Sequence, residues 1–220
     1  VKMLIDTVQS SRFLTKKQAD KIISKLERLC SKHERKTLNH KVIIANRAKS
    51  DNYHILQNMD EIHRAIESNK QIRFQYYGFD MYKKKEYHHF GNEYRVSPFA
   101  LIYHQGLYTL IAIPARDTRI RFYRIDRMEN VVVSRADRLH EEIFNEIDID
   151  RFTSGTFGLH ASEVRDVTLK CHKSLVDTIM DRFGADVPFT IVDEKYFEVT
   201  VPAVMNADFY GWVFSLGGRI

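Results

Sequence analysis

The sequence predicts an α+β protein in which a helical linker precedes a small, strongly bent antiparallel β-barrel and a second α+β unit. Apolar residues recur at helical spacing in the first quarter of the chain, which predicts helices. About five short strands follow at close spacing between residues 72 and 134, a pattern typical of small barrels. The order strand, helix, strand, strand, helix then predicts a separate unit. The predicted divisions are 1–56 (helical linker and dimerisation segment), 57–137 (barrel), 138–162 (connecting segment) and 163–220 (last unit).

The composition is that of an ordinary globular protein of one large or two small domains. The chain has 220 residues, 44% of them hydrophobic, and a mean hydropathy of −0.38. No apolar run approaches the roughly 20 residues of a membrane helix, and no secretory signal is visible. Cys30 and Cys171 are too few for a disulfide framework or a cysteine zinc site. We therefore expect a cytoplasmic protein with no membrane partner.

The net charge of +5 is unevenly spread along the chain. Residues 12–49 hold 12 Lys and Arg against 3 Asp and Glu, whereas residues 139–220 hold 7 against 14. Residues 116–138 hold 7 Arg and no Lys, against 4 acids. These asymmetries indicate separate modules with separate partners. The basic first segment could contact DNA phosphates or could be a solvated helix face.

Two capping signals place helices in the first third of the chain. Thr15 and Gln18 stand at capping-box spacing before an apolar stripe of helical period that runs to Leu29. Asn58 and Glu61 give the same signal before another helix. The chain opens inside an apolar helical pattern without an initiator Met and stops where a strand would begin, so we expect a fragment.

The apolar period then changes from helical to alternating. The predicted strands cover residues 72–77, 94–103 with a bend near Pro98, 107–113, 119–125 and 131–134. Residues 80–93 are polar and are predicted to form a loop or a hairpin tip, and Gln105-Gly106 is predicted to be a turn.

The last unit is predicted to contain two helices and three strands. The strands cover 164–171, 187–192 and 196–204, and the helices cover 174–183 and 207–216. This order lacks only a final strand to be ferredoxin-like.

Several segments carry a family resemblance. In the predicted barrel they are YRVSPFAL at 94–101, GLYTL at 106–110 and RFYRIDRM at 121–128, and their order and spacing fit as well as their residue types. Together they resemble the WYL domain of bacterial transcriptional regulators. DFYGWVFSLG at 208–217 is similar to the extension that follows WYL domains, and residues 4–15 are similar to the segment after a winged helix-turn-helix. The most specific part is the Arg-x-x-Arg-Ile-Asp-Arg block.

The resemblance implies a fold and a role. WYL domains have an Sm-like, SH3-type barrel. Their regulators bind promoter DNA through a winged helix-turn-helix, which is absent from this sequence, and sense a ligand, often a nucleic acid or nucleotide, on the WYL domain. Regulators of palindromic sites are usually dimers, so we expect a homodimer. The family's name-giving triplet aligns with Tyr108-Thr109-Leu110, where Thr replaces an aromatic residue and removes its phenol.

An arginine cluster is the most informative candidate site. Four arginines crowd into residues 119–127, and a guanidinium offers a fixed fork that binds phosphate through paired hydrogen bonds. The alternative is structural, with one arginine paired to Asp126 and others solvated. The predicted anion-binding residues are Arg95, Arg121, Arg124 and Arg127, of which Arg127 is the one expected to have a structural role.

Aromatic residues interleave with this cluster. Arginine beside exposed rings is typical of surfaces that stack the bases of single-stranded nucleic acid. Alternating aromatics in strands are more often core, and we assign Phe74 and Phe122 to the core. Tyr76 and Tyr108 are predicted to be walls of a ligand pocket, because a tyrosine needs an outlet for its hydroxyl.

These observations predict a non-enzymatic ligand sensor. An anionic effector binds the barrel and shifts the placement of barrel, linker and last unit, which changes promoter binding by an attached domain. No catalytic motif or metal-ligand spacing is present, so no cofactor or metal is expected. Two alternatives stay open. One is a stand-alone barrel that binds single-stranded nucleic acid with steep salt dependence. The other is a dimerisation scaffold whose arginine cluster is paired internally.

Overall fold

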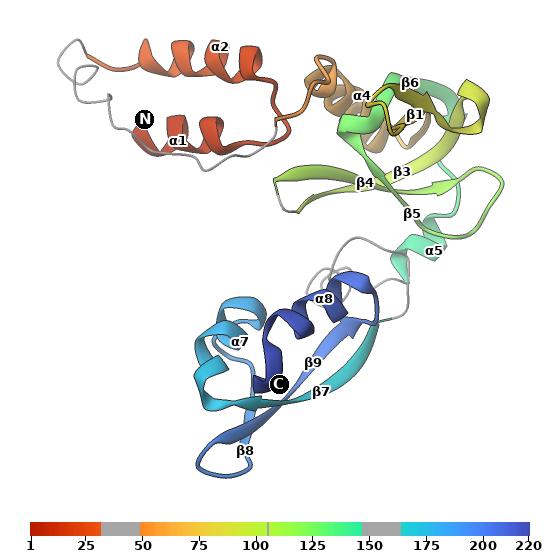
Figure 1. Cartoon of the computed structure of the whole chain (residues 1–220). Helices are drawn as coiled ribbons and strands as arrows, with labels where there is room; N and C mark the ends of the chain where they lie inside the picture. The colour runs from red at the N-terminus through yellow and green to blue at the C-terminus, as the bar shows by residue number, and fades with distance from the viewer. Residues whose placement is uncertain (32–48, 105, 147–163) are drawn as a thin grey trace. The chain divides into compact units, whose positions relative to one another are not determined.

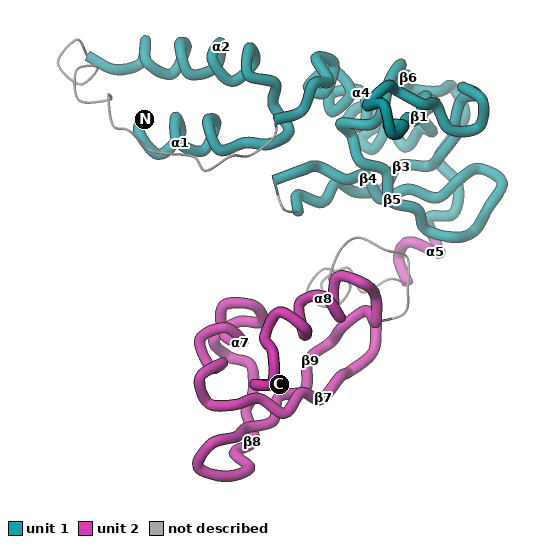
Figure 2. Tube along the Cα trace, in the orientation of Figure 1, with its two compact units in different colours: residues 1–141 teal, residues 142–220 magenta. Residues whose placement is uncertain are grey.

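The chain folds into two compact units, which are treated separately below. The computed structural model describes residues 1–31, 49–104, 106–146 and 164–220 (Figure 1). The first unit comprises residues 1–141 and the second residues 142–220 (Figure 2). The predicted mixture of helices and antiparallel sheet is confirmed. In the described ranges, every helix is too short or too polar to cross a membrane.

Two helices begin the first unit. Helix α1 spans Lys2–Ser10 and α2 spans Lys16–Glu27 (Figure 1). The predicted capping box is confirmed: Thr15 Oγ1 accepts a hydrogen bond from the Gln18 amide at 3.2 Å, and Gln18 Oε1 accepts one from the Thr15 amide at 3.0 Å. This reciprocal pair satisfies amides that a helix start leaves unpaired. Leu29, predicted to extend the apolar stripe, lies beyond α2 and is 76% exposed.

Helix α4 spans Ile55–Glu67 and begins before the predicted capping signal. Asn58 is therefore not a cap; it lies buried inside the helix, where its Nδ2 donates to the Met128 carbonyl at 2.8 Å. The capping prediction was wrong because a buried carbonyl on a distant strand needs a donor, and leaving it unpaired costs about 1–3 kcal/mol. A tertiary hydrogen bond thus overrides the local preference of Asn for a helix start.

A curled antiparallel sheet follows α4 and forms a half-barrel. Its strands run in the order β2-β1-β3-β4-β5, and β6 also pairs with β1. Their bounds are Lys70–Phe79 for β1, Lys85–Tyr87 for β2, Tyr94–His104 for β3, Leu107–Pro114 for β4, Arg121–Arg124 for β5 and Met128–Asp137 for β6. The register of β3 against β4 shifts between Pro98 and Ala100, at the predicted bend. Such irregularities bend a strand and help the sheet to curl.

The structure corrects several predicted strand limits. The segment predicted as a loop contains the short strand β2 and the 3-10 turn η1 (His88–Gly91). Strand β5 begins at Arg121, so Arg119 lies outside it, and β6 is longer than predicted. A second 3-10 turn, η2 (Ile125–Arg127), joins β5 to β6. Gly106 has a φ of +82°, in keeping with a turn, while Gln105 lies outside the described residues.

The inner face of the half-barrel and one face of α4 form the core of the first unit. Phe74 is fully buried, as predicted, whereas Phe122 is only half-buried and lies outside this core. Each large apolar side chain buried here stabilises the fold by roughly 1.5–3 kcal/mol. Helix α4 packs against β1, β3 and β6. Its buried apolar residues are Ile55, Ile62 and Ala65, and the strands contribute Ile72, Phe74, Val96, Leu110, Ala112 and Met128.

The second unit has a three-stranded antiparallel sheet in the order β7-β9-β8. Its elements follow the predicted order: β7 (Val164–His172), η3 (Lys173–Leu175), α7 (Val176–Phe183), β8 (Phe189–Ile191), β9 (Tyr196–Val204), α8 (Ala207–Ser215) and η4 (Gly217–Arg219). Gly184 ends α7 with a φ of +98°, a conformation that glycine adopts without strain. Within the predicted connecting segment the structure shows α5 (Glu141–Asn145), and residues 147–162 lie outside the described ranges.

Candidate functional site

A pocket of about 930 Å³ opens on the inner face of the half-barrel. Cross-strand register explains its position: Phe74 lies opposite Tyr94, and Leu110 lies opposite Tyr123. Residues paired in this way point to the same face of a sheet. Tyr94 and Tyr123 therefore lie on the same face of the sheet as the core residues Phe74 and Leu110. They line the pocket where the half-barrel is open. Its lining comes from β1, η1, the start of β3, the connection from β4 to β5, and β5.

Three tyrosine rings form one wall of the pocket. The ring centroids of Tyr76, Tyr94 and Tyr123 lie 5.6–6.0 Å apart in edge-to-face contacts, and Phe74 packs beneath them. Burial raises the pKa of all three phenols, so each is neutral at pH 7 and can donate a hydrogen bond. The Tyr76 hydroxyl accepts from the Arg124 amide at 3.2 Å, which leaves its own proton available. Tyr76 thus lies on a wall of this pocket.

Arg121 and Arg116 supply positive charge at the pocket. Arg121 Nη2 donates to Asp117 Oδ2 at 3.3 Å, and its side chain is 46% exposed. Asp117 also pairs with Arg119, whose hydrogen bonds hold the pKa of that carboxyl well below its usual range. Arg116 is exposed and has no carboxylate within ion-pair distance among the described residues. Glu93 also lines the pocket and pairs with Arg73 at 3.1 Å, so the three lining arginines exceed the two lining acids by one positive charge.

Arg95 also lines the pocket, but strand geometry limits its contribution. It stands between Tyr94 and Val96, both on the inner face, so alternation directs its side chain to the other face of β3. Its backbone carbonyl accepts from the Ala115 amide at 3.0 Å and holds the connection from β4 to β5 against β3. Arg95 thus lies beside the site, and its main described contact is the hydrogen bond that its backbone carbonyl accepts.

Arg124 and Arg127 do not line the pocket; they surround the carboxylate of Asp126. Arg124 Nε and Nη2 donate to the two carboxylate oxygens of Asp126 at 3.1 and 2.7 Å. Arg127 Nε lies 3.9 Å from the same carboxylate, and its guanidinium stacks over the Phe79 ring at 4.4 Å. The hydrogen bonds to Asp126 raise the pKa of Arg124. These two predicted ligand residues are therefore engaged by a buried acid of the fold.

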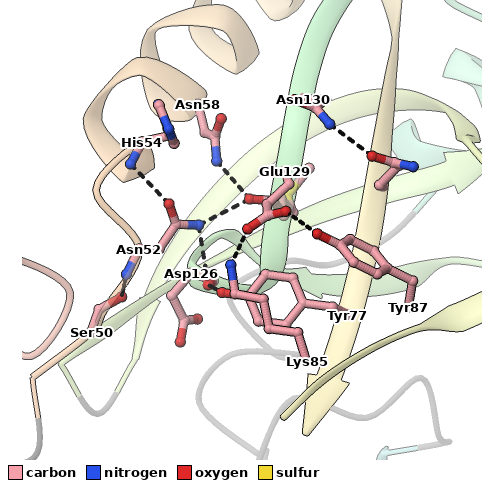
Figure 3. A network of polar contacts seen from close by, with 12 residues as sticks. Ser50, Asn52, His54, Asn58, Tyr77, Lys85, Tyr87, Asp126, Glu129 and Asn130 are labelled. Carbon is pink, nitrogen blue, oxygen red and sulfur yellow. Dashed lines mark hydrogen bonds and ion pairs between the residues drawn. The ribbon is translucent and has the colours of Figure 1, made fainter. Parts of the chain in front are cut away.

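A polar network fixes the backbone beside this arginine pair (Figure 3). Asn52 Nδ2 donates to the carbonyls of Asp126 and Met128 at 3.3 and 3.0 Å. Asn58 Nδ2 donates to the Met128 carbonyl, and the Tyr77 hydroxyl donates to the Asp126 carbonyl at 2.9 Å. Each donor comes from a different part of the first unit, so the network ties the segment before α4, α4 itself and β1 to η2.

The same network reaches the hairpin between β1 and β2. Glu129 accepts hydrogen bonds from Lys85 Nζ and from the Tyr87 hydroxyl (Figure 3). Asn130 Nδ2 donates to Gln75 Oε1 at 2.7 Å. These contacts attach β2 to β6 across β1 and explain why a polar segment is ordered there.

Tyr108 lies outside the pocket. Its ring makes an edge contact with Phe13, with centroids 4.8 Å apart, and a tilted contact with Tyr103 at the same distance. Beside it, a Cβ at Gly106 would meet Arg12 Cδ at 2.9 Å. Tyr108, the first residue of the aligned triplet, therefore packs against the segment between α1 and α2. Arg121, Tyr76 and Arg95 are brought together by the structure, whereas Arg124, Arg127 and Tyr108 lie elsewhere.

Five of the pocket residues that sequence reasoning did not predict carry aromatic rings or positive charge. Tyr94 and Tyr123 could have been found by noting that they share a face with Tyr76 once the strands are paired. The others stand in connecting segments, where no periodic signal shows direction. These five residues are His88, His89, Tyr94, Arg116 and Tyr123.

Comparisons with known proteins locate one domain in the chain. Residues 57–133 match the family model of the WYL domain. No curated protein matches the chain. Among solved structures, the chain is similar to proteasome accessory factor B/C (PafBC) of Arthrobacter aurescens, with 16% identity and a TM-score of 0.36. That similarity covers 76% of this chain and 24% of the other, so the chain spans about a quarter of the length of that structure.

Proposed function

We propose that residues 57–133 are the ligand-sensing domain of a transcription regulator and that the tyrosine-lined pocket takes an anionic effector, a nucleotide or nucleic acid. The observation that carries the proposal is that the WYL match coincides with this pocket. In the proposal, the half-barrel is the Sm-like barrel of that domain and the second unit is its ferredoxin-like extension. The strand order β7-β9-β8 supports the latter, because it is the order of the first three strands in that fold.

The chemistry of the pocket suits an anion attached to an apolar group. Arg121 and Arg116 can each present a fork of N–H donors to phosphate or carboxylate oxygens. Asp117 holds Arg121 from one side and leaves part of its guanidinium exposed. The three neutral phenols add donors beneath, and their rings offer an apolar surface. A charge-assisted hydrogen bond contributes roughly 1.5–3 kcal/mol, so the loss of one such arginine should weaken binding tenfold or more.

The proposed signal leaves the pocket along β5. Arg121 and Tyr123 lie on this strand, which runs directly into η2. Asn52 holds η2 through the carbonyl of Asp126, so the segment that leads from the helices to α4 contacts the same turn. An effector that prefers one arrangement of β5 thereby biases this segment, and through it a DNA-binding domain of a homodimeric regulator on its promoter. The effector acts only by its difference in affinity between the two arrangements.

Binding of labelled oligonucleotides tests the proposal. We would measure fluorescence anisotropy of a short single strand and a duplex at two salt concentrations. Wild type is compared with Arg121→Ala and with Arg119→Ala, a matched control that pairs with the same Asp117 but does not line the pocket. We expect binding that salt weakens, an approximately tenfold loss in Arg121→Ala and no change in Arg119→Ala. Equal affinities of Arg121→Ala and wild type would overturn the proposed site.

A second candidate function is a dimerisation scaffold without a ligand. The internal pairing of Arg124 and Arg127 with Asp126 favours it, because this hypothesis predicts a cluster that is satisfied within the fold. It also predicts that Arg124→Ala loses stability and that Arg121→Ala changes nothing measurable. Analytical ultracentrifugation of both variants, together with the anisotropy data, separates the two functions.

A further inference from the structure

The rim of the pocket holds two consecutive residues in a strained backbone conformation. His89 has φ and ψ of 52° and 37°, and Phe90 has 57° and 29°, both in the left-handed region. Side chains other than glycine rarely adopt this conformation because Cβ crowds the backbone. The Gln75 side chain holds the turn by donating to the Gly91 carbonyl at 2.8 Å, and the Asn92 amide donates to the His89 carbonyl at 3.0 Å. The fold therefore maintains this turn against its local preference.

Burial of Phe90 does not explain the strain, because its side chain is fully exposed. The turn instead positions two imidazoles beside the tyrosine wall. The His88 ring meets Tyr76 edge-on, with centroids 5.5 Å apart and an interplanar angle of 89°. The His89 ring tilts against Tyr94 at 4.9 Å. Strain of this kind collects at ligand clamps, where it holds a group in place before the ligand arrives.

The pocket therefore combines six aromatic side chains with arginines at its edge. Flat rings that meet edge-to-face leave slots that suit another flat ring, because aromatic groups favour edge and offset contacts. A sugar phosphate, an aliphatic acid or inorganic phosphate would bind the arginines through its anion but would bring no aromatic ring to the slots between the side chains. The rings are Tyr76, Tyr94, Phe122, Tyr123, His88 and His89, the cations are Arg95, Arg116 and Arg121, and the acids are Glu93 and Asp117.

From this geometry we propose that the effector is a small molecule with a planar aromatic ring that carries a phosphate or carboxylate group. The ring lies against the imidazoles and the tyrosines, and the anion binds Arg116 and Arg121. This inference rests on the proposed function. It narrows the class of effector to small molecules that place a single aromatic ring system in the pocket. A volume of about 930 Å³ holds a ligand of that size.

Two matched pairs of ligands test whether the ring is recognised. AMP is compared with ribose 5-phosphate, and phenyl phosphate with inorganic phosphate, by isothermal titration calorimetry on the whole chain. Within each pair the anion is the same and only one member carries a ring. We expect the ring to strengthen binding by tenfold or more in at least one pair. A preference in the nucleotide pair alone identifies a nucleobase, and a preference in both identifies a general aromatic anion.

Glycine substitutions test the clamp without disturbing its backbone. His89→Gly removes one imidazole while glycine adopts the left-handed conformation freely. Phe90→Gly is the matched control, because it relieves the same strain but removes a side chain that does not line the pocket. We expect His89→Gly to reduce the preference for the ring at least threefold while ribose 5-phosphate binds as before. Phe90→Gly keeps the wild-type preference.

The outcomes of these measurements distinguish a failure of this inference from a failure of the proposed function. If none of the four anions binds, the inference is overturned, whereas the proposed function fails only if the labelled oligonucleotides do not bind either. If the anions bind with equal affinity whether or not they carry a ring, only the inference is overturned. Equal loss of the ring preference in His89→Gly and Phe90→Gly would also overturn it, because the turn would then act through its backbone alone.

Discussion

The arginine-rich segment has two ends that differ in how their acids are placed. At one end, Arg119 and Arg121 share Asp117, whose side chain is 25% exposed, and Arg121 lines the pocket. At the other, Arg124 and Arg127 share Asp126, which is 10% exposed and whose backbone is held by Asn52 and Tyr77. The same residue type therefore lines the pocket at one end and is paired within the fold at the other. Burial of the acid, and not the number of arginines, sets the difference.

The largest expected effect comes from removing the charge of the buried acid. Asp126→Asn leaves Arg124 and Arg127 beside a neutral side chain, and we expect the free energy of unfolding to fall by about 3 kcal/mol. This is the lower end of the range for a broken buried ion pair, because Arg124 is partly open to water. Urea denaturation measures the change. Asp117→Asn is the matched control at the other end, where solvent screens the pair and the midpoint should barely move. Equal losses in both variants would contradict the distinction between the two ends.

The network that holds the buried end should be nearly as sensitive. Asn52→Ala removes donors to the carbonyls of Asp126 and Met128, and we expect a loss of about 2 kcal/mol because buried carbonyls lose a partner. Ser50→Ala is a control that removes only one hydrogen bond to the Asn52 amide. Chemical denaturation of both variants compares them. If the free energy of unfolding falls as much in Ser50→Ala as in Asn52→Ala, the effect comes from the local conformation of residues 50–52. The hydrogen bonds from Asn52 to the carbonyls of Asp126 and Met128 would then not explain it.

Local signals in the sequence predicted much of the fold. The capping box at Thr15 and Gln18 and the alternation that buries Phe74 each depend on neighbours a few residues away, and the structure confirms both. Asn58 failed as a cap because its partner, the Met128 carbonyl, is 70 residues distant in sequence. Strand β2 was missed because polar contacts to Glu129 hold it, with no apolar alternation of its own. Long-range polar pairing leaves no periodic trace in a single sequence.

The site was harder to predict than the fold for a related reason. Arginine spacing indicated an anion site but could not say which guanidinium groups the fold would use itself. Pairing with Asp126 was an open alternative, and only the burial of that acid distinguishes Arg124 from Arg121. Tyr108 aligned with a family position, yet its neighbour Phe13 comes from a segment nearly a hundred residues earlier. Residues in connections, such as His89 and Arg116, have no periodicity from which direction can be inferred.

A smaller effect is expected at the Tyr77 hydroxyl. Tyr77→Phe removes one hydrogen bond to the Asp126 carbonyl and keeps the ring packed, so we expect a loss of about 1 kcal/mol at pH 7. Tyr87→Phe removes a hydroxyl from the exposed pair with Glu129 and serves as the control. Thermal and urea unfolding measure both. If Tyr77→Phe leaves the free energy of unfolding unchanged, Asn52 alone is sufficient to hold η2.

The last expected effect is a dependence on alkaline pH that should be specific to the same tyrosine. Burial raises the pKa of Tyr77 to about 12, whereas an unfolded tyrosine titrates near 10. A group whose pKa is raised by folding contributes its full stabilisation below the unfolded value and loses it as the pH rises through the folded one. The stability advantage of wild type over Tyr77→Phe should therefore be constant up to about pH 10 and shrink between pH 10 and 12. Tyr76 and Tyr123 also have raised pKa values, but they are present in both proteins and cancel in the difference. Urea unfolding of the two proteins at intervals from pH 9 to 12 gives this difference directly. If the unfolding free energies of the two proteins change in parallel over that range, the Tyr77 phenol is as accessible to water in the folded state as in the unfolded one. The Tyr77 hydroxyl would then not be a buried donor to the Asp126 carbonyl.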